Sequence, residues 1–168
     1  GCASWTTHLV HARLLLEDVR SSMTETTLVR EDSWPAGLRV AQVRVARPTD
    51  KLAEVEEFYA SHLGLPVLYR FVDHDGFDGV MLGLPGGHYH LEFTSSHAGS
   101  PCPAPSRENL LVLYFEGEAA MYDTVERLAG FGHVPVDADN PYWGRTGALT
   151  FEDPDGWRIV LAPRPVVL

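Results

Sequence analysis

Residues 73–93 read DHDGFDGVMLGLPGGHYHLEF and contain two segments with the composition of β-strands, Phe77–Leu84 and His88–Phe93. The segments are separated by Pro85-Gly86-Gly87, in which proline presets a turn conformation and glycine supplies the positive φ of a tight hairpin. The stretch therefore predicts a β-hairpin, and the rest of the chain is interpreted around it.

The second strand of this hairpin alternates between apolar and polar side chains. Its apolar positions are Tyr89, Leu91 and Phe93, and its polar positions are His88, His90 and Glu92. Because successive side chains of a strand point to opposite faces, the imidazoles and the carboxylate share one face. We expect that polar face to line a cavity.

A similar hairpin closes the chain, with strands at 147–151 and 157–162 around the turn Glu152-Asp153-Pro154-Asp155-Gly156. When the two hairpin sequences are aligned with Leu91 opposite Ile159, Phe93 also falls opposite Leu161. The correspondence indicates an internal repeat, in which each half contributes one structural unit.

Each half is predicted to form a β-α-β-β-β unit. The elements expected before the first hairpin are a half-buried strand at 38–45, a helix at 52–63 that ends at Gly64, and a strand at 65–72. Those expected before the second hairpin are a strand at 109–115, a helix at 118–131, a short strand at 134–137 and a loop at 140–144. Two such units predict an α+β fold of tandem modules whose sheets curl into a cup.

These elements divide the chain into segments. The predicted segments are an N-terminal extension at 1–37, module one at 38–94, a linker rich in proline and serine at 95–108, module two at 109–162 and a tail at 163–168. Within the extension, residues 1–22 precede Met23 and are interpreted as an upstream addition.

The composition excludes several classes of protein. The chain of 168 residues is 45% hydrophobic with a net charge of −10, and it has no basic run that could neutralise the phosphates of a nucleic acid. No apolar run approaches the roughly 20 residues of a membrane-spanning helix. Cys2 and Cys102 are too far apart in sequence to indicate a disulfide framework. We expect a cytoplasmic protein that contacts neither nucleic acid nor membrane.

Two short motifs carry a resemblance to a known family. They are Phe58-Tyr59 with Leu63-Gly64-Leu65 at the end of the first helix, and FEDPDGWRI at 151–159. Together with the tandem modules, they resemble the vicinal oxygen chelate superfamily of glyoxalase I, bleomycin-resistance proteins and extradiol dioxygenases, over residues 38–161. The resemblance implies two modules placed edge to edge, a cup that binds a small molecule, and a homodimer.

In metal-binding members of that superfamily, four ligands come from the first and last strands of the two modules. The matching positions here are Val40 (with Gln42 next on the same face), Glu92, Asn109 and Val160. Only Glu92 is a strong ligand, so the family's full metal site is not expected and no cofactor is favoured. A different set, His88, His90 and Glu92, would be the candidate ligands for zinc, nickel, manganese or iron.

Other polar side chains are predicted to face the cup. The candidate ligand-binding residues are Gln42, Arg44, His90, Glu92, Asn109, Tyr142, Trp143 and Arg158. Arg44 and Arg158 are alternatively rim residues or ion-pair partners of Glu92. Tyr142 and Trp143 would either stack on a flat ligand or plug the end of the cup.

Two classes of function follow from these residues. The favoured one is a binding protein that sequesters a small, partly aromatic molecule without a metal, as bleomycin-resistance proteins do. The alternative is a metal-dependent lyase, isomerase or dioxygenase of the glyoxalase type. Between them lies metal-free acid–base catalysis, in which His90 and Glu92 form a hydrogen-bonded catalytic pair.

Overall fold

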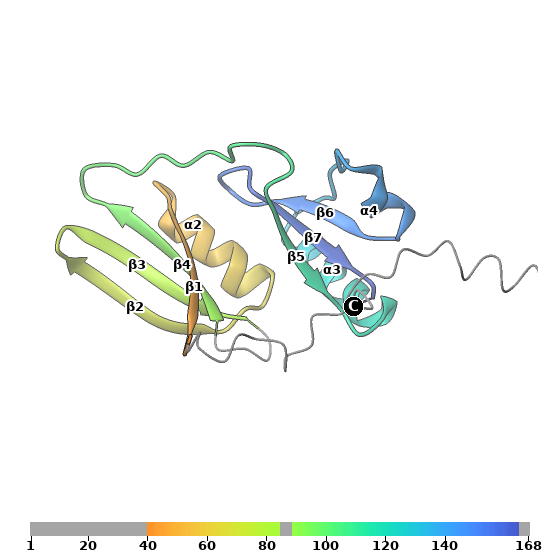
Figure 1. Ribbon diagram of the computed structural model, residues 1–168, viewed down its shortest axis with the longest axis horizontal. Coiled ribbons are helices and arrows are strands. Elements are labelled where there is room, and N and C mark those ends of the chain that lie inside the picture. The colour runs from red at the N-terminus through yellow and green to blue at the C-terminus, as the bar shows by residue number, and fades with distance from the viewer. Residues whose placement is uncertain (1–39, 85–88, 165–168) are drawn as a thin grey trace, which may run out of the picture. The chain divides into compact units, whose positions relative to one another are not determined.

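The first half of the chain forms a β-α-β-β-β unit in the computed structural model, which describes residues 40–84 and 89–164 (Figure 1). Its elements are β1 (Val43–Pro48), α2 (Leu52–Glu56), the π-helical η2 (Glu57–His62), β2 (Val67–His74), β3 (Phe77–Gly83) and β4 (Tyr89–Ser96). The predicted hairpin is present as β3 and β4. Its turn, together with His88, lies outside the described residues.

The strands of this unit form one sheet in the order β1-β4-β3-β2. β1 is parallel to β4, whereas β3 is antiparallel to both of its neighbours. A parallel pair requires a crossover connection, and here the connection between β1 and β4 contains α2, η2, β2 and β3. The first and last strands of the unit are therefore adjacent, and their side chains share faces.

The second half repeats this plan. It contains β5 (Leu110–Tyr114), α3 (Glu118–Gly130), α4 (Pro141–Arg145), β6 (Leu149–Glu152) and β7 (Arg158–Ala162). The sheet order is β5-β7-β6, and its first strand is again parallel to its last. The predicted α+β fold of two related modules is confirmed. Among the residues that the structure describes, no helix is long and apolar enough to cross a membrane.

Two predictions for the second module were wrong. The strand expected at 134–137 is reduced to a single bridge between Val136 and Thr150. The loop expected at 140–144 contains the helix α4, which begins after Asn140. The Asn140 side chain accepts a hydrogen bond from the Tyr142 N–H at 3.0 Å, and Pro141 occupies the first helical position. An asparagine cap followed by proline is a helix start signal, which the aromatic residues of this segment obscured.

The prediction for the first strand was wrong in extent and in burial. Residues 38 and 39 lie outside the described residues, and 40–42 are not in the strand, which runs from Val43 to Pro48. Val43 and Val45 are 46% and 59% exposed. Their exposure follows from the sheet order, because β1 is an edge strand and α2 packs against β3 and β4.

One hydrophobic core joins the two modules. The helices contribute Val55, Phe58, Met121 and Leu128, and the sheets contribute Val80, Leu82, Leu91, Phe93, Phe151, Ile159 and Leu161. The predicted apolar face of β4 is confirmed at Leu91 and Phe93, whereas Tyr89, at the start of the strand, is 45% exposed.

A buried ion-pair network, the Arg47 cluster, also connects the modules. Arg47 at the end of β1 donates to Asp153 and, at 2.9 Å, to Asp155 in the turn between β6 and β7. Tyr59 donates its phenolic hydrogen to Asp153 at 2.9 Å. Burial, and then the Asp153 charge, raises the pKa of Tyr59 well above its ordinary value, so the phenol stays protonated. The guanidinium carbon lies 4.9 Å from the ring centroids of Phe93 and Trp157.

Two histidines form another contact between the modules. His62 Nδ1 lies 2.8 Å from His133 Nε2, so one ring donates a hydrogen bond to the other. The ring of Phe131 stacks on His62 at a centroid distance of 4.0 Å. Burial, and then the charge on His62, lowers the pKa of His133 below its ordinary value.

This pair predicts a loss of stability in mild acid. Since the pKa of His133 is lower in the folded state, the unfolded chain binds a proton first as the pH falls below about 6.5. The free energy of unfolding should therefore fall from pH 7.5 to pH 5.5, as measured by urea denaturation. His133→Gln should flatten this dependence. An identical pH dependence in the variant and the parent protein would contradict the assignment.

Candidate functional site

The predicted polar face of β4 lies beside β1 through the parallel register of these strands. The register pairs Arg44 with His90 and Ala46 with Glu92. His90 and Glu92 are buried, with 4% and 7% of their surface exposed. The Arg44 side chain is 46% exposed. Two buried polar residues are thus placed next to a cation that reaches solvent.

Arg44 connects these two residues. Its Nη1 donates to both carboxylate oxygens of Glu92, at 3.0 and 3.1 Å, and its Nε donates to His90 Nε2 at 3.0 Å. Since a guanidinium can only donate, His90 Nε2 acts as the acceptor in this contact. His90 Nδ1 lies 3.4 Å from the side-chain nitrogen of Gln42. His90 and Glu92 are thus bridged by a guanidinium and do not form the direct hydrogen-bonded pair that the sequence suggested.

Arg158 occupies a position unlike the predicted rim position. It is only 2% exposed, and its Nε and Nη2 donate to Glu152 at 3.2 and 3.1 Å. Its Nη1 donates to the Asp137 carbonyl at 3.1 Å and lies 3.6 Å from the Asp139 carboxylate. The guanidinium is fully used in holding the segment before α4 against β6 and β7.

A cavity of about 340 Å³ has walls formed by both modules, along β1 and β5. Three of the predicted ligand-binding residues line it: Glu92, Asn109 and Arg158. Three more lining residues, which the sequence reasoning did not select for this site, are Arg47, Tyr59 and Trp157. The cavity is not lined by Gln42, Arg44 or His90. Arg44 nevertheless donates hydrogen bonds to the lining residue Glu92.

The missed residues belong to the Arg47 cluster. The sequence around Asp153 and Asp155 predicts a turn but does not show that these carboxylates are buried, where they need cationic partners. The position of Arg47 at the end of the alternating strand β1 is the sequence feature that could have indicated a functional or structural role. Its pairing with Asp153 could not be predicted, because the two residues are far apart in the sequence.

Tyr142 and Trp143 lie away from this cavity. Trp143 on α4 packs against the face of the second sheet formed by Leu110, Val112, Ala148, Val160 and Ala162. Its indole N–H is buried without a hydrogen-bond partner among the described residues. Both aromatics line a separate cavity of about 300 Å³ together with Tyr114, Arg145 and Arg164. The stacking and plugging roles predicted for these two aromatic residues both stay predictions.

The side chains at these positions do not fit a divalent metal. Among residues 40–84 and 89–164, no three histidine, cysteine, aspartate or glutamate side chains are grouped closely enough to hold an ion. His90 and Glu92 already receive hydrogen bonds from Arg44, and the corresponding strand of the second module carries Arg158 and Val160. His88, the third member of the alternative ligand set, lies outside the described residues.

Comparison with known proteins shows which families and structures this chain is similar to. Family models for the YycE-like N-terminal and C-terminal domains match residues 43–94 and 108–163. The Bacillus subtilis protein YycE is 44% identical over 125 residues, which are 74% of this chain and 89% of YycE. A crystal structure of YycE superposes with a TM-score of 0.74 at 41% identity, covering 79% of this chain and 96% of that one.

Two more distant structures share the fold. The trypanothione-dependent glyoxalase I of Leishmania major superposes with a TM-score of 0.57 at 20% identity, over 75% of this chain and 87% of the enzyme. TnmS3, an antibiotic-binding protein of a Streptomyces species, superposes with a TM-score of 0.54 at 21% identity, over 76% of this chain and 99% of TnmS3. The resemblance indicated by the sequence motifs is confirmed.

Proposed function

This chain belongs to the YycE-like family of the glyoxalase and bleomycin-resistance superfamily, and from that premise we propose that it binds a small molecule in the cavity along β1 and β5. The observation that carries the proposal is the placement of Glu92, whose buried carboxylate lines the cavity and is held by Arg44. An oriented carboxylate in a mostly apolar cavity is the kind of polar group that fixes a ligand's orientation.

The lining favours a small and partly aromatic ligand. The volume of about 340 Å³ is at the lower end of the range for ligand pockets. The partly exposed Trp157 offers a ring surface, and Asn109 and Glu92 contribute an amide and a carboxylate to the lining. Arg47, Arg158 and Glu92 are each paired with an opposite charge of the protein, so we propose that Glu92 meets a neutral ligand, or a cationic one that competes with Arg44.

The donor set supports sequestration over metal-dependent catalysis. Glu92 is a good ligand, but the second module offers Arg158 and Val160 where further ligands would be needed. Metal-free acid–base chemistry is also less favoured, because both nitrogens of His90 face polar groups of the protein, Arg44 and Gln42. The antibiotic-binding protein TnmS3 has the same fold and is consistent with a binding function.

Metal analysis and a ligand screen test this proposal together. Incubation with Zn²⁺, Ni²⁺, Mn²⁺ or Fe²⁺ is expected to leave no stoichiometric ion, as measured by elemental analysis. Planar aromatic molecules that raise the melting temperature should lose affinity in Glu92→Gln by roughly tenfold or more, the loss of a hydrogen bond to a charged group. A stoichiometric ion that disappears in Glu92→Ala would instead support the glyoxalase-type enzyme.

The ion pair between Arg44 and Glu92 predicts that replacing either residue lowers the free energy of unfolding by a different amount. Arg44→Met should lower the free energy of unfolding by about 1–3 kcal/mol, because it leaves the buried Glu92 carboxylate without its donor. Glu92→Gln should cost less, because the Arg44 guanidinium is half-exposed and can be hydrated. Urea denaturation of both variants measures the difference, and equal losses would contradict the assigned geometry.

The family resemblance extends the proposal to a homodimer. Light scattering should give a molar mass of two chains at micromolar concentration. A mass of one chain at every accessible concentration would contradict the homodimer. The proposed binding site would then have to be formed by one chain.

A further inference from the structure

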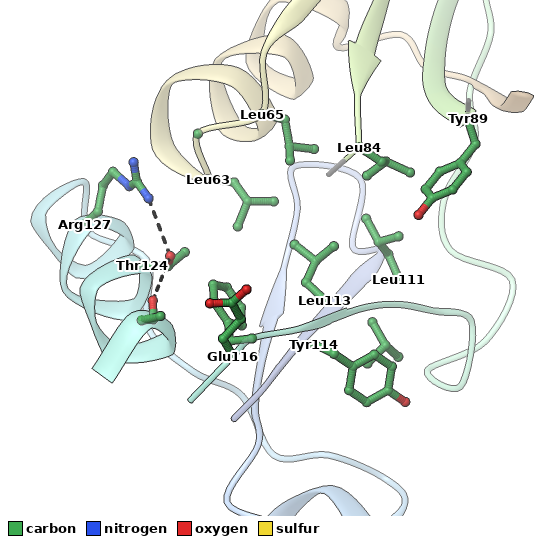
Figure 2. A pocket seen from close by; sticks show the side chains of 14 residues that line it. Leu63, Leu65, Leu84, Tyr89, Leu111, Leu113, Tyr114, Glu116, Thr124 and Arg127 are labelled. Carbon is green, nitrogen blue, oxygen red and sulfur yellow. Dashed lines mark hydrogen bonds between the residues drawn. The ribbon is translucent and has the colours of Figure 1, made fainter. Parts of the chain in front are cut away.

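A second cavity, of about 730 Å³, lies between α3, β5 and the end of η2 (Figure 2). Leu84 and Leu111 line both this cavity and the one that contains Glu92. None of the candidate ligand-binding residues discussed above lines it. Its volume falls within the range of pockets that hold small molecules.

The walls of this cavity are mainly aliphatic. Figure 2 shows leucine side chains around it, contributed by Leu63, Leu65, Leu84, Leu111 and Leu113. Six consecutive residues, Leu111 to Glu116, line it, so the unpaired edge of β5 itself forms part of the wall. Leu63 and Leu65 are buried in the core, whereas Leu84, Leu111 and Leu113 are only partly buried. An apolar molecule would bury its surface against these three side chains.

Arg127 on α3 lines the same cavity and is held in place by the other module. A Cβ atom on Gly64 would lie 2.8 Å from Arg127 Nη1, so the guanidinium packs against the bare backbone of that glycine. Gly64 also has a φ of +94°, which favours glycine at this position. The position of the cation therefore depends on a residue that has no side chain.

The described residues use little of the hydrogen-bonding capacity of Arg127. Its Nη2 donates to the hydroxyl of Thr124 at 3.5 Å (Figure 2). Within residues 40–84 and 89–164, no carboxylate lies within ion-pair distance of it, although the chain has 23 acidic and 13 basic residues. An unpaired guanidinium beside aliphatic walls is suited to a carboxylate, which it can bind with two parallel hydrogen bonds.

Among the described residues that line this cavity, Glu116 carries the one carboxylate, and it has a different role. Glu116 directly precedes Gly117, the N-cap of α3. A negative charge at this point interacts favourably with the N-terminus of the 13-residue helix. Glu116 therefore has a favourable interaction with the helix N-terminus, whereas the charge of Arg127 lacks a counterpart among the described residues.

We propose that this cavity is a second binding site, which takes an amphipathic carboxylate. The apolar body of the ligand lies against the leucines and the edge of β5, and its carboxylate pairs with Arg127 beside the Thr124 hydroxyl. This site shares the walls Leu84 and Leu111 with the proposed site at Glu92 but uses different polar residues, so substitutions of those polar residues distinguish the two.

Three probes with the same alkyl chain test the proposal: decanoate, decanol and decyltrimethylammonium. Titration calorimetry below the micellar concentrations should show decanoate binding to the full chain at one per protein. Decanol should bind roughly tenfold to a hundredfold more weakly, because it cannot form the charged hydrogen bonds. Equal binding of the three probes would show adsorption to apolar surface and overturn the proposal.

Variants locate the site. Arg127→Gln, at an exposed position, should keep the melting temperature and remove the preference for decanoate over decanol. Arg145→Gln, a matched change at another exposed arginine, should leave decanoate binding unchanged. Loss of decanoate binding in Arg145→Gln or in Glu92→Gln, with Arg127→Gln unaffected, would place the ligand elsewhere and overturn the proposal. The site at Glu92 would remain testable by its own ligand screen.

Discussion

Arg47→Met is expected to lower the free energy of unfolding by about 3–5 kcal/mol, the cost of removing one partner from a buried ion pair. The Arg47 side chain is 11% exposed and the Asp153 side chain is 0% exposed. Without the guanidinium, Asp153 would keep its hydrogen bond from Tyr59 but would lose its cationic partner. Urea denaturation monitored by circular dichroism measures the change.

Two comparisons make this result specific. Asp153→Asn in the Arg47→Met background should recover much of the loss, because asparagine removes the buried charge. The asparagine oxygen can still accept from the N–H groups of Asp155 and Trp157. Arg70→Met, which breaks the pair of Arg70 with Glu56, should have a far smaller effect because the Arg70 side chain is 57% exposed. A loss in Arg47→Met no larger than that in Arg70→Met would contradict the structural role of the cluster.

Phe93→Ala should also be strongly destabilising, by about 3–5 kcal/mol. The ring is 3% exposed and stacks on Tyr59 at a centroid distance of 4.8 Å. Its removal leaves a cavity in the core that joins the modules, and it also removes a ring beside the Arg47 guanidinium. The effect should appear as a lower denaturation midpoint with little change in the slope of the transition.

Phe77→Ala is the matched control for this variant. Phe77 lies on β3 of the same sheet and is 44% exposed, so its replacement should change the free energy of unfolding by about 0.5 kcal/mol or less. Similar losses in the two variants would mean that Phe93 is not a core residue. Combined with Arg47→Met, Phe93→Ala should give less than the sum of the single losses, since the side chains are in contact.

The chemistry of the candidate site depends on which cation meets Glu92. In a metal-binding member of the superfamily, a divalent ion would be held by four side chains from both modules. Here the guanidinium of Arg44 donates to Glu92 and to His90. A guanidinium supplies hydrogen bonds in fixed directions but cannot accept further ligands as a metal does. This difference supports a function in recognition.

Local sequence patterns determined much of the fold. The alternation along β4 predicted that Leu91 and Phe93 are buried and that His90 and Glu92 share the opposite face. The correspondence between the two hairpins predicted the repeat of modules. Such features depend on the period of a strand and on turn residues, which neighbouring positions in the sequence reveal.

The charge pairing was decided by the tertiary structure alone. Arg44 meets Glu92 because β1 is placed parallel to β4 across an intervening helix, and Arg47 meets Asp153 because the two modules share a core. The partners are separated by 48 and 106 residues in the sequence. Arg158 was expected at a rim and is buried for the same reason, since its partner Asp139 lies on a segment that only folding brings to β7.

The physical reason for this division is the range of each interaction. Strand period, turns and caps act over a few residues, so the sequence alone determined the tandem modules and the polar face that carries Glu92. Burial and ion pairing depend on which strands become neighbours, and strand order depends on crossover connections and on packing of the whole core. The tertiary structure therefore decided that arginines surround the candidate site, that Trp143 covers the second sheet, and that Arg127 borders a second cavity.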